Sequence, residues 1–343
     1  MFGFELPVVW FILVAFLFAG YFLLEGFDFG VGMLLPFIGR DEPRRKAMLG
    51  TIGPVWDGNE VWLITAGGAL FAAFPEWYAS MFSGFYLPLF LILIALIVRI
   101  VGLEWRSKVH EDSWRVWCDG AIIFGSWVPP IIWGVAVANL IRGVPLDANR
   151  TLDSGFATLV GLLNPYALLG GAAFASVFAF HAIAFLRLKT AGVLREEVGR
   201  AAAIPAGLAL LTGSLFLLWT QLSFGKPWVW VPLGIAAGAL VVAVATIAAG
   251  RDGISFTASS IAVVAVTVVA FGSMYPFLMP TTLADGVSLD IWNSSSNPYT
   301  LTIMTWSAVA ITPLVLAYQA WTYWAFRKRI TAEPTQIVPQ PGY

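Results

Sequence analysis

The chain has 343 residues, of which 59% are hydrophobic and 11% are charged, and its formal net charge is −1. Soluble domains carry about 25% charged residues, so a chain this apolar cannot cover its surface in water and is read as an integral membrane protein. The charge gives no case for nucleic acid as a partner. The single cysteine, Cys118, excludes an internal disulfide and any multi-cysteine metal or iron–sulfur site. The 16 tryptophans fit anchoring at the membrane interfaces.

The chain is predicted to cross the membrane nine times. A spanning helix needs about 20 apolar residues. The first apolar segment is interpreted as a retained helix rather than a signal peptide, because it carries Glu5, no basic residue and no small-residue cleavage site in residues 20–33. The predicted spans are residues 6–24 or 6–36, 52–74, 78–98, 120–140, 164–186, 201–222, 228–249, 255–278 and 301–326.

Lys and Arg alternate sharply between the two sides of these predicted spans. One side receives 16 of the 19 basic residues, at positions 40, 44–46, 99, 106, 108, 115, 187, 189, 195, 200, 251 and 327–329, and the other receives only those at 142, 150 and 226. Basic loops stay cytoplasmic. The N-terminus is therefore predicted outside and the C-terminus in the cytoplasm, as an odd number of spans requires. The longest outside loops are then residues 141–163 and 279–300.

The predicted fold is all-α, with one polytopic membrane domain over residues 1–330 and no water-soluble domain. A polar, proline-bearing cytoplasmic tail at residues 331–343 is expected to be disordered. No internal repeat is evident. Periodicity does not decide whether the helices divide into a first four-helix bundle at about residues 1–140, a second at 160–280 and a peripheral ninth helix at 300–326.

Carboxylates inside the predicted spans are the main candidates for chemistry. Glu25 and Asp28 lie three residues apart on one helix face, and Asp57 and Glu60 repeat that spacing on the next span. At about 1.5 Å per residue, Glu25 lies about 28 Å from the outside end of its span and Asp57 about 10 Å from the cytoplasmic end. Both pairs therefore belong to the cytoplasmic half. Six ionisable groups from four spans are expected in that layer, the other two being Arg99 and Asp119.

These ionisable groups have two interpretations. A charge in lipid is expensive, so the side chains must face the bundle interior or water. They could form a proton or cation path from the cytoplasm. Alternatively they only fix helix ends, with Arg99 pairing a carboxylate and Asp57 capping a helix after Pro54. Repulsion between two carboxylates one turn apart favours the path for Asp57 and Glu60, while both interpretations stay open for Arg99 and Asp119.

The chain has two histidines, and neither is predicted to bind a metal. His110 lies in a polar cytoplasmic loop and is expected to be solvated. His181, near the cytoplasmic end of its span, is expected to be hydrogen-bonded rather than a ligand. Haem iron needs axial His, Met, Cys or Tyr, and two histidines this far apart cannot support a bis-histidine site. The sequence therefore predicts no haem and no metal site on this chain.

Seven segments spread over the whole chain resemble subunit II of the bacterial cytochrome bd quinol oxidases. They include LLEGFDFGVGML, PVWDGNEVWLITAGGALFAAFP and GSWVPPIIWGVAVANLIRGVP, and they extend from the first predicted span to the last. The most specific motif is W-D-G-N-x-V-W-L at residues 56–63. Some relatives in that family have Gln at the position of Glu60. A relative with Asp at the position of Glu25 would keep the carboxyl group there.

The resemblance implies a complex of the bacterial cytoplasmic membrane that oxidises quinol, reduces oxygen to water and builds a proton gradient without pumping. This chain would be its haem-free subunit, built from two four-helix bundles and a peripheral ninth helix. The partner, subunit I, would carry haems b558, b595 and d and the quinol-oxidising loop. The sequence leaves open which quinone is used, whether a structural quinone binds, and whether small single-helix accessory subunits join.

The resemblance also assigns roles to residues, none of them catalytic on this chain. It implies a cytoplasmic proton path at the subunit interface and a hydrophobic oxygen route. Two rival functions stay open: a purely structural partner subunit, and a stand-alone proton or cation transporter, which would be expected to show broken helices and inverted repeats. The assigned residues are Asp57, Glu25, Asp28, Glu60 and Trp56 for the proton path, Arg99 and Asp119 for charge compensation, and Trp62 for the oxygen route.

Overall fold

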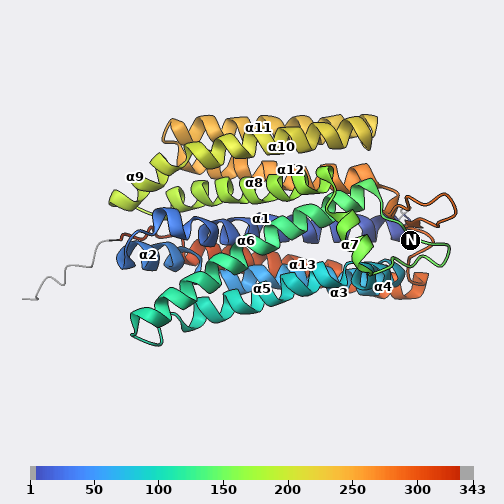
Figure 1. The fold of residues 1–343 in the computed structure, drawn as a ribbon, viewed down its shortest axis with the longest axis horizontal. Coiled ribbons are helices and arrows are strands. Elements are labelled where there is room, and N and C mark those ends of the chain that lie inside the picture. Colours follow the sequence, from blue (N-terminus) through green and yellow to red (C-terminus); the bar gives the residue numbers. More distant parts are fainter. Residues whose placement is uncertain (1–4, 333–343) are drawn as a thin grey trace, which may run out of the picture.

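The computed structural model describes residues 5–332, which contain thirteen α-helices running mostly along one direction (Figure 1). Only two short strands interrupt the helices in these residues. The elements are α1 (Leu6–Ile38), α2 (Glu42–Ile52), α3 (Trp56–Ala73), α4 (Pro75–Gly84), α5 (Tyr86–Trp105), α6 (Asp112–Arg142), α7 (Phe156–Leu162), α8 (Pro165–Lys189), α9 (Gly192–Ala201), α10 (Ala203–Ser223), the 3₁₀ turn η1 (Pro227–Val229), α11 (Trp230–Ala248), α12 (Asp252–Met274), β1 (Phe277–Met279), β2 (Leu289–Asp290) and α13 (Pro298–Ala325).

Eight of the described helical segments are long and apolar enough to cross a membrane, and they correspond to eight of the nine predicted spans. These are α1, α5, α6, α8, α10, η1 with α11, α12 and α13. The remaining predicted span corresponds to α3, an 18-residue helix whose first turn is polar. The chain is therefore a multi-pass membrane protein, while the count of nine spans and the orientation stay predictions.

Several predicted span boundaries change in the structure, including those of the first and third spans. The first helix takes the longer of its two predicted forms and continues to Ile38, so its 33 residues span about 50 Å at 1.5 Å per residue. The span predicted at residues 78–98 corresponds to α5 but begins and ends later, because residues up to Gly84 belong to the separate helix α4 and α5 runs from Tyr86 to Trp105. At the end of α4, Gly84 packs directly against the side chain of Leu152, where a Cβ atom would overlap it.

Three short helices were not predicted, because none is long or apolar enough to be recognised as a span. The first, α2, begins where the Asp41 carboxylate accepts a hydrogen bond from the Arg44 backbone N–H at 3.0 Å. The second, α7, and the strand β2 lie in the two loops that were predicted outside, while β1 replaces the predicted end of the span at residues 255–278, because α12 already ends at Met274. Those loops are joined, since Val144 N–H donates to the Pro280 carbonyl at 3.0 Å and Thr282 N–H donates to the Val144 carbonyl at 3.0 Å. The third, α9, lies at the opposite end of the molecule beside α2 (Figure 1).

Among the described residues, the long helices pack around two large clusters of buried apolar side chains and two small ones. Helices α8, α10, α11 and α12 contact one another, and α1 contacts α3 and α6, which in turn packs on α5. The two groups share contacts, because α8 also packs on α1 and α6. At one crossing, a Cβ atom on Gly134 would overlap the carbonyl of Gly170, so the backbones of α6 and α8 touch. The division of residues 1–330 into two bundles stays a prediction.

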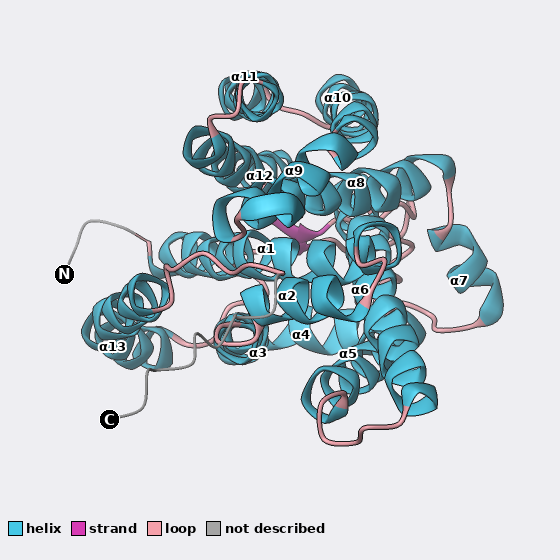
Figure 2. Ribbon diagram, turned by 90° about the vertical axis from the view of Figure 1, so that its left-hand side faces the viewer, coloured by secondary structure: helices cyan, strands magenta, loops and turns pink. Residues whose placement is uncertain are grey.

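The last helix, α13, lies at the edge of the molecule beside α1 and α3 (Figure 2). Only Leu301 in it is fully buried. The chain after α13 returns to the turn between α8 and α9, where Ile330 N–H donates to the Lys189 carbonyl at 2.8 Å and Ala191 N–H donates to the Ile330 carbonyl at 3.0 Å. The tail predicted at residues 331–343 lies outside the described residues from position 333 onward.

Candidate functional site

Four of the predicted residues meet in the interior as one group, called here the acid cluster: Glu25, Asp28, Glu60 and Arg99. Helix α1 supplies Glu25 and Asp28 from one face, α3 supplies Glu60, and α5 supplies Arg99. One Arg99 nitrogen, Nη1, donates to Glu25 Oε2 at 3.0 Å and to Glu60 Oε1 at 3.2 Å. Glu25, Asp28 and Arg99 are 0% exposed. The guanidinium also lies 4.7 Å from the ring centre of Phe29, where a cation is attracted to the aromatic face.

An amide that the sequence did not assign completes this site. Asn59 is fully buried and donates from Nδ2 to Asp28 Oδ2 at 2.6 Å. Its Oδ1 accepts from Gln319 Nε2 at 3.0 Å and from the Tyr323 hydroxyl at 2.8 Å. The edge helix α13 therefore reaches the acid cluster through Asn59.

The acid cluster is short of hydrogen-bond partners and of positive charge. It holds three carboxyl groups and one guanidinium. Buried polar atoms normally have partners, yet several here have none among residues 5–332. These atoms are Glu25 Oε1, Asp28 Oδ1, Arg99 Nε, Arg99 Nη2 and the hydroxyl of the neighbouring Tyr21. Polar atoms of this kind, gathered in one place, are suited to binding water or exchangeable protons.

The residues Trp56 and Asp57 open α3 one turn before Glu60. A carboxylate in the first turn of a helix is stabilised by the free backbone N–H groups there. The Asp57 side chain is exposed on the surface of this chain, while Trp56 is only 9% exposed. Asp57 therefore lies outside the acid cluster, at the start of the helix that leads to it. Its predicted role as a relay stays a prediction.

The predicted position of Asp119 is wrong in one respect, since α6 begins at Asp112 and Asp119 lies about two turns inside it. The Asp119 carboxylate is bonded to other arginines and not to Arg99. It belongs to a separate group, called here the end network: Glu42, Arg45, Arg106 and Asp119. Arg106 Nε donates to Asp119 Oδ1 at 2.6 Å, and Arg45 Nη1 donates to Asp119 Oδ2 at 2.7 Å.

The same Arg106 grips Glu42 with two parallel hydrogen bonds. Nη1 donates to Oε1 at 2.8 Å and Nη2 donates to Oε2 at 2.7 Å. This fork geometry fixes both side chains. The hydrogen bonds from Arg106 lower the pKa of the Glu42 carboxyl below its usual value. The end network therefore ties α2 to α5 and α6 at the end of the molecule.

The histidines lie as the sequence predicts in two respects. His110 is exposed, and His181 is hydrogen-bonded. His181 is fully buried, with Nδ1 at 2.8 Å from the Ser259 hydroxyl and Nε2 at 3.1 Å from the Leu23 carbonyl. Its ring stacks on Phe256 with centres 5.1 Å apart. Both ring nitrogens are used in joining α8 to α1 and α12.

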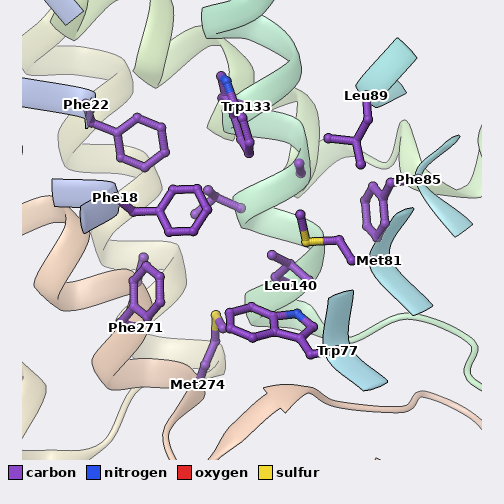
Figure 3. A pocket seen from close by; sticks show the side chains of 13 residues that line it. Phe18, Phe22, Trp77, Met81, Phe85, Leu89, Trp133, Leu140, Phe271 and Met274 are labelled. Carbon is purple, nitrogen blue, oxygen red and sulfur yellow. The ribbon is translucent and has the colours of Figure 1, made fainter. Parts of the chain in front are cut away.

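An apolar cavity of about 30 Å³ lies among α1, α4, α5, α6 and α12, and Figure 3 shows aromatic side chains directed into it. Next to it, a groove of about 580 Å³ runs along α3, α4 and α5. The two share Phe18, Met81, Leu89 and Trp133 as lining residues. The predicted oxygen-route residue Trp62 is 9% exposed and packs on Phe16, with ring centres 5.7 Å apart. Its role stays a prediction.

Comparison with known proteins now identifies the family. Residues 6–326 match the family described as cytochrome bd terminal oxidase subunit II. The chain belongs to this family. It is 37% identical to cytochrome bd ubiquinol oxidase subunit 2 of Bacillus subtilis, over 94% of this chain and 96% of that protein. It is 34% identical to cytochrome bd-I ubiquinol oxidase subunit 2 of Escherichia coli, over 96% of each.

A solved structure of the bd oxidase from Geobacillus thermodenitrificans contains a chain of the same fold. The TM-score is 0.76 with 18% sequence identity, and the match covers 94% of this chain and 98% of that one. Family membership and the apolar helices make this chain a multi-pass protein of the bacterial inner membrane and a subunit of a respiratory terminal oxidase.

Proposed function

We propose that this chain is the haem-free subunit of a complex that oxidises quinol and reduces oxygen to water, and that it brings cytoplasmic protons toward the haems of subunit I. The family and the names of its relatives support the reaction and the partner. The predicted orientation, with nine spans and a cytoplasmic C-terminus, puts the acid cluster in the cytoplasmic half. In the same proposal, haems b558, b595 and d belong to subunit I.

The observation that carries the proton role is the imbalance of the acid cluster. A buried carboxylate without a partner is expensive. One guanidinium cannot offset three ionised carboxylates, and Asp28 Oδ1 and Glu25 Oε1 have no partner within the described residues. A cluster of this composition holds protons that can be exchanged. Its exposed entrance is Asp57, which lies one helical turn before Glu60.

The proposed path runs from water at Asp57 to Glu60 and on to Glu25 and Asp28. Arg99 fixes Glu25 and Glu60 and offsets part of their charge. Trp56 closes the start of α3 beside the relay. We further propose that oxygen moves through the apolar groove and cavity near Trp62, because apolar space dissolves a nonpolar gas. Each of these residues serves chemistry that takes place on the partner chain.

The Asp57→Asn variant of the two-subunit complex tests this function. Asparagine keeps the volume of the side chain but cannot carry a proton, so quinol-dependent oxygen consumption is expected to fall by about tenfold or more. Haem content is expected to stay unchanged. The matched control is Asp112→Asn, another carboxylate in the first turn of a helix, which is expected to leave turnover within about twofold.

Three outcomes separate the rival functions. Normal turnover of Asp57→Asn would remove Asp57 from the path. A loss of haem from the complex together with turnover would favour a purely structural subunit. Proton or cation transport by the chain in vesicles without a haem-bearing partner would favour the transporter.

A further inference from the structure

We propose that Gln319 and Tyr323 of α13 are positioning residues that hold the Asn59 amide in the one orientation in which it donates to Asp28. This proposal rests on the proposed role of the acid cluster in proton transfer. Under this proposal, the edge helix α13 contributes to proton transfer by orienting Asn59. Nothing in the family description or in the names of the relatives assigns these two residues.

The geometry fixes the orientation of the amide from its acceptor end. Gln319 and Tyr323 lie four residues apart, on one face of α13. Both donate to the same atom, Asn59 Oδ1, at 3.0 Å and 2.8 Å. An asparagine amide has one acceptor end and one donor end. With Oδ1 occupied by two donors, Nδ2 must face Asp28, and it lies 2.6 Å from Asp28 Oδ2.

The opposite orientation would place the amide oxygen against the Asp28 carboxylate. Two acceptors would then face each other in a buried site, where such a contact is costly. The donors on α13 therefore hold Asn59 Nδ2 against Asp28 Oδ2, while Asp28 Oδ1 has no partner within the described residues. The charged and titratable groups around Asp28 are Glu25 on its own helix, Glu60 on α3, Arg99 on α5 and Tyr323 on α13.

The register of α13 is fixed at both ends, which holds the two donors level with Asn59. Near its start, Trp10 Nε1 donates to the Leu301 carbonyl at 3.2 Å and to Thr305 Oγ1 at 3.0 Å. Beyond its end, Ile330 is hydrogen-bonded to the turn after α8. These contacts place Gln319 and Tyr323 on an otherwise exposed helix at the depth of the acid cluster.

The competing explanation is that the two polar residues only dock α13 onto α3. Redundancy separates the two explanations, because one donor is enough to orient the amide whereas docking energy is lost stepwise. The test compares Gln319→Leu, Tyr323→Phe and the double variant in the full two-subunit complex. The readouts are kcat and KM for quinol, the pH dependence of kcat, and haem content. Tyr318→Phe on the exposed face of α13 is the matched control.

Each single variant is expected to keep kcat within about twofold, because the second donor remains. The double variant is expected to lower kcat about tenfold, without a change in KM or haem content, and to move the pH profile by about one unit, since a hydrogen bond to a charged group is lost. Asn59→Leu should reproduce this phenotype, and adding the double change to it should lower kcat no further.

The proposal would be overturned if each single variant lowered kcat, the two losses multiplied in the double variant, and the pH dependence of kcat did not change. If the double variant fails to assemble, Gln319→Asn combined with Tyr323→Phe keeps an amide on α13 but shortens its reach. The proposal then expects the same loss of kcat, and wild-type turnover would refute it. If Asp57→Asn and Glu25→Gln lower turnover while the double variant does not, the proton path stands and the positioning role fails.

Discussion

Two arginines seven residues apart, Arg99 in α5 and Arg106 directly after its end, each lie at the centre of a group of acids, and the two groups are built differently. At Arg106, in the end network, two guanidinium groups face two carboxylates, and Asp119 binds both arginines. At Arg99, in the acid cluster, one guanidinium faces three carboxyl groups and leaves Nε and Nη2 without partners in the described chain.

This difference in charge balance separates a structural ion-pair network, the end network, from a candidate functional site, the acid cluster. A balanced, fully hydrogen-bonded group on the rim fixes α2 against its neighbours, and it has no reason to exchange protons. An unbalanced group of charges in the interior costs stability. Such a group is explained if it takes part in proton transfer. The predictions below test this contrast, from the largest expected effect to the smallest.

The largest contrast is expected from removing each arginine. Arg99→Met leaves three buried carboxyl groups without a cation and is expected to cost about 3–5 kcal/mol, because uncompensated buried charge is severely destabilising. Arg106→Met is expected to cost about 1–3 kcal/mol, since Arg45 still pairs with Asp119. Thermal unfolding of the two variant complexes, compared with the unmodified one, measures the difference. Equal losses of stability would erase the contrast.

Neutral isosteres of one acid from each group give the next contrast. Glu25→Gln is expected to lower oxidase turnover by about tenfold or more, because a proton carrier is lost. Asp119→Asn is expected to leave turnover within about twofold, because Asp119 lies outside the acid cluster and both of its carboxylate oxygens are bonded to arginines. Oxygen consumption per haem measures both. A turnover loss confined to Asp119→Asn would reverse the assignment of the two groups.

The smallest effect concerns pH and the end network. Arg106 lowers the pKa of Glu42 in the folded chain, so this contact stabilises the fold above the unfolded pKa of about 4.3 and is lost as pH falls through the lower folded value. The Glu42 side chain is 44% exposed, so solvent screens the interaction. Glu42→Gln should therefore lower the melting temperature slightly at neutral pH, and the difference should shrink as the pH falls below about 4.3 and vanish below the folded pKa. A difference that is constant with pH would exclude this contact as its cause.

The sequence predicted helices well where hydrophobic length and a capping residue agree. The span predicted at residues 164–186 is α8, which begins at Pro165 because Asn164 accepts a hydrogen bond from the Ala167 N–H at 3.0 Å. Helices α2 and α9 were missed because they are short and lie at the end of the molecule, where apolar length carries no signal. The break between α4 and α5 was missed because the apolar run of residues 78–98 continues through it and gives no signal of a helix end.

The candidate site was predicted in part, for a related reason. The meeting of Glu25, Asp28, Glu60 and Arg99 followed from their depth in the spans. The partner of Asp119 could not be derived, because Arg99 and Arg106 lie only seven residues apart in the sequence and only the packing of α5 on α6 selects between them. Gln319 was not assigned because its partner, Asn59, is 260 residues away. Its spacing of four from Tyr323, within an apolar span, was the available signal.

The hydrogen bonds between Ile330 and the turn after α8 have a consequence for biosynthesis. Lys189 also binds the carbonyl of Phe326, which is 137 residues later in the chain. The turn after α8 is therefore synthesised long before its partners Phe326 and Ile330. The contacts that fix the end of α13 can form only when the last described residues have been translated. Until then the polar face of α3 around Asn59 has no cover on that side. An incompletely translated chain would thus expose a polar surface within the bilayer. Exposed polar groups of this kind are a feature by which membrane quality control recognises unfinished proteins.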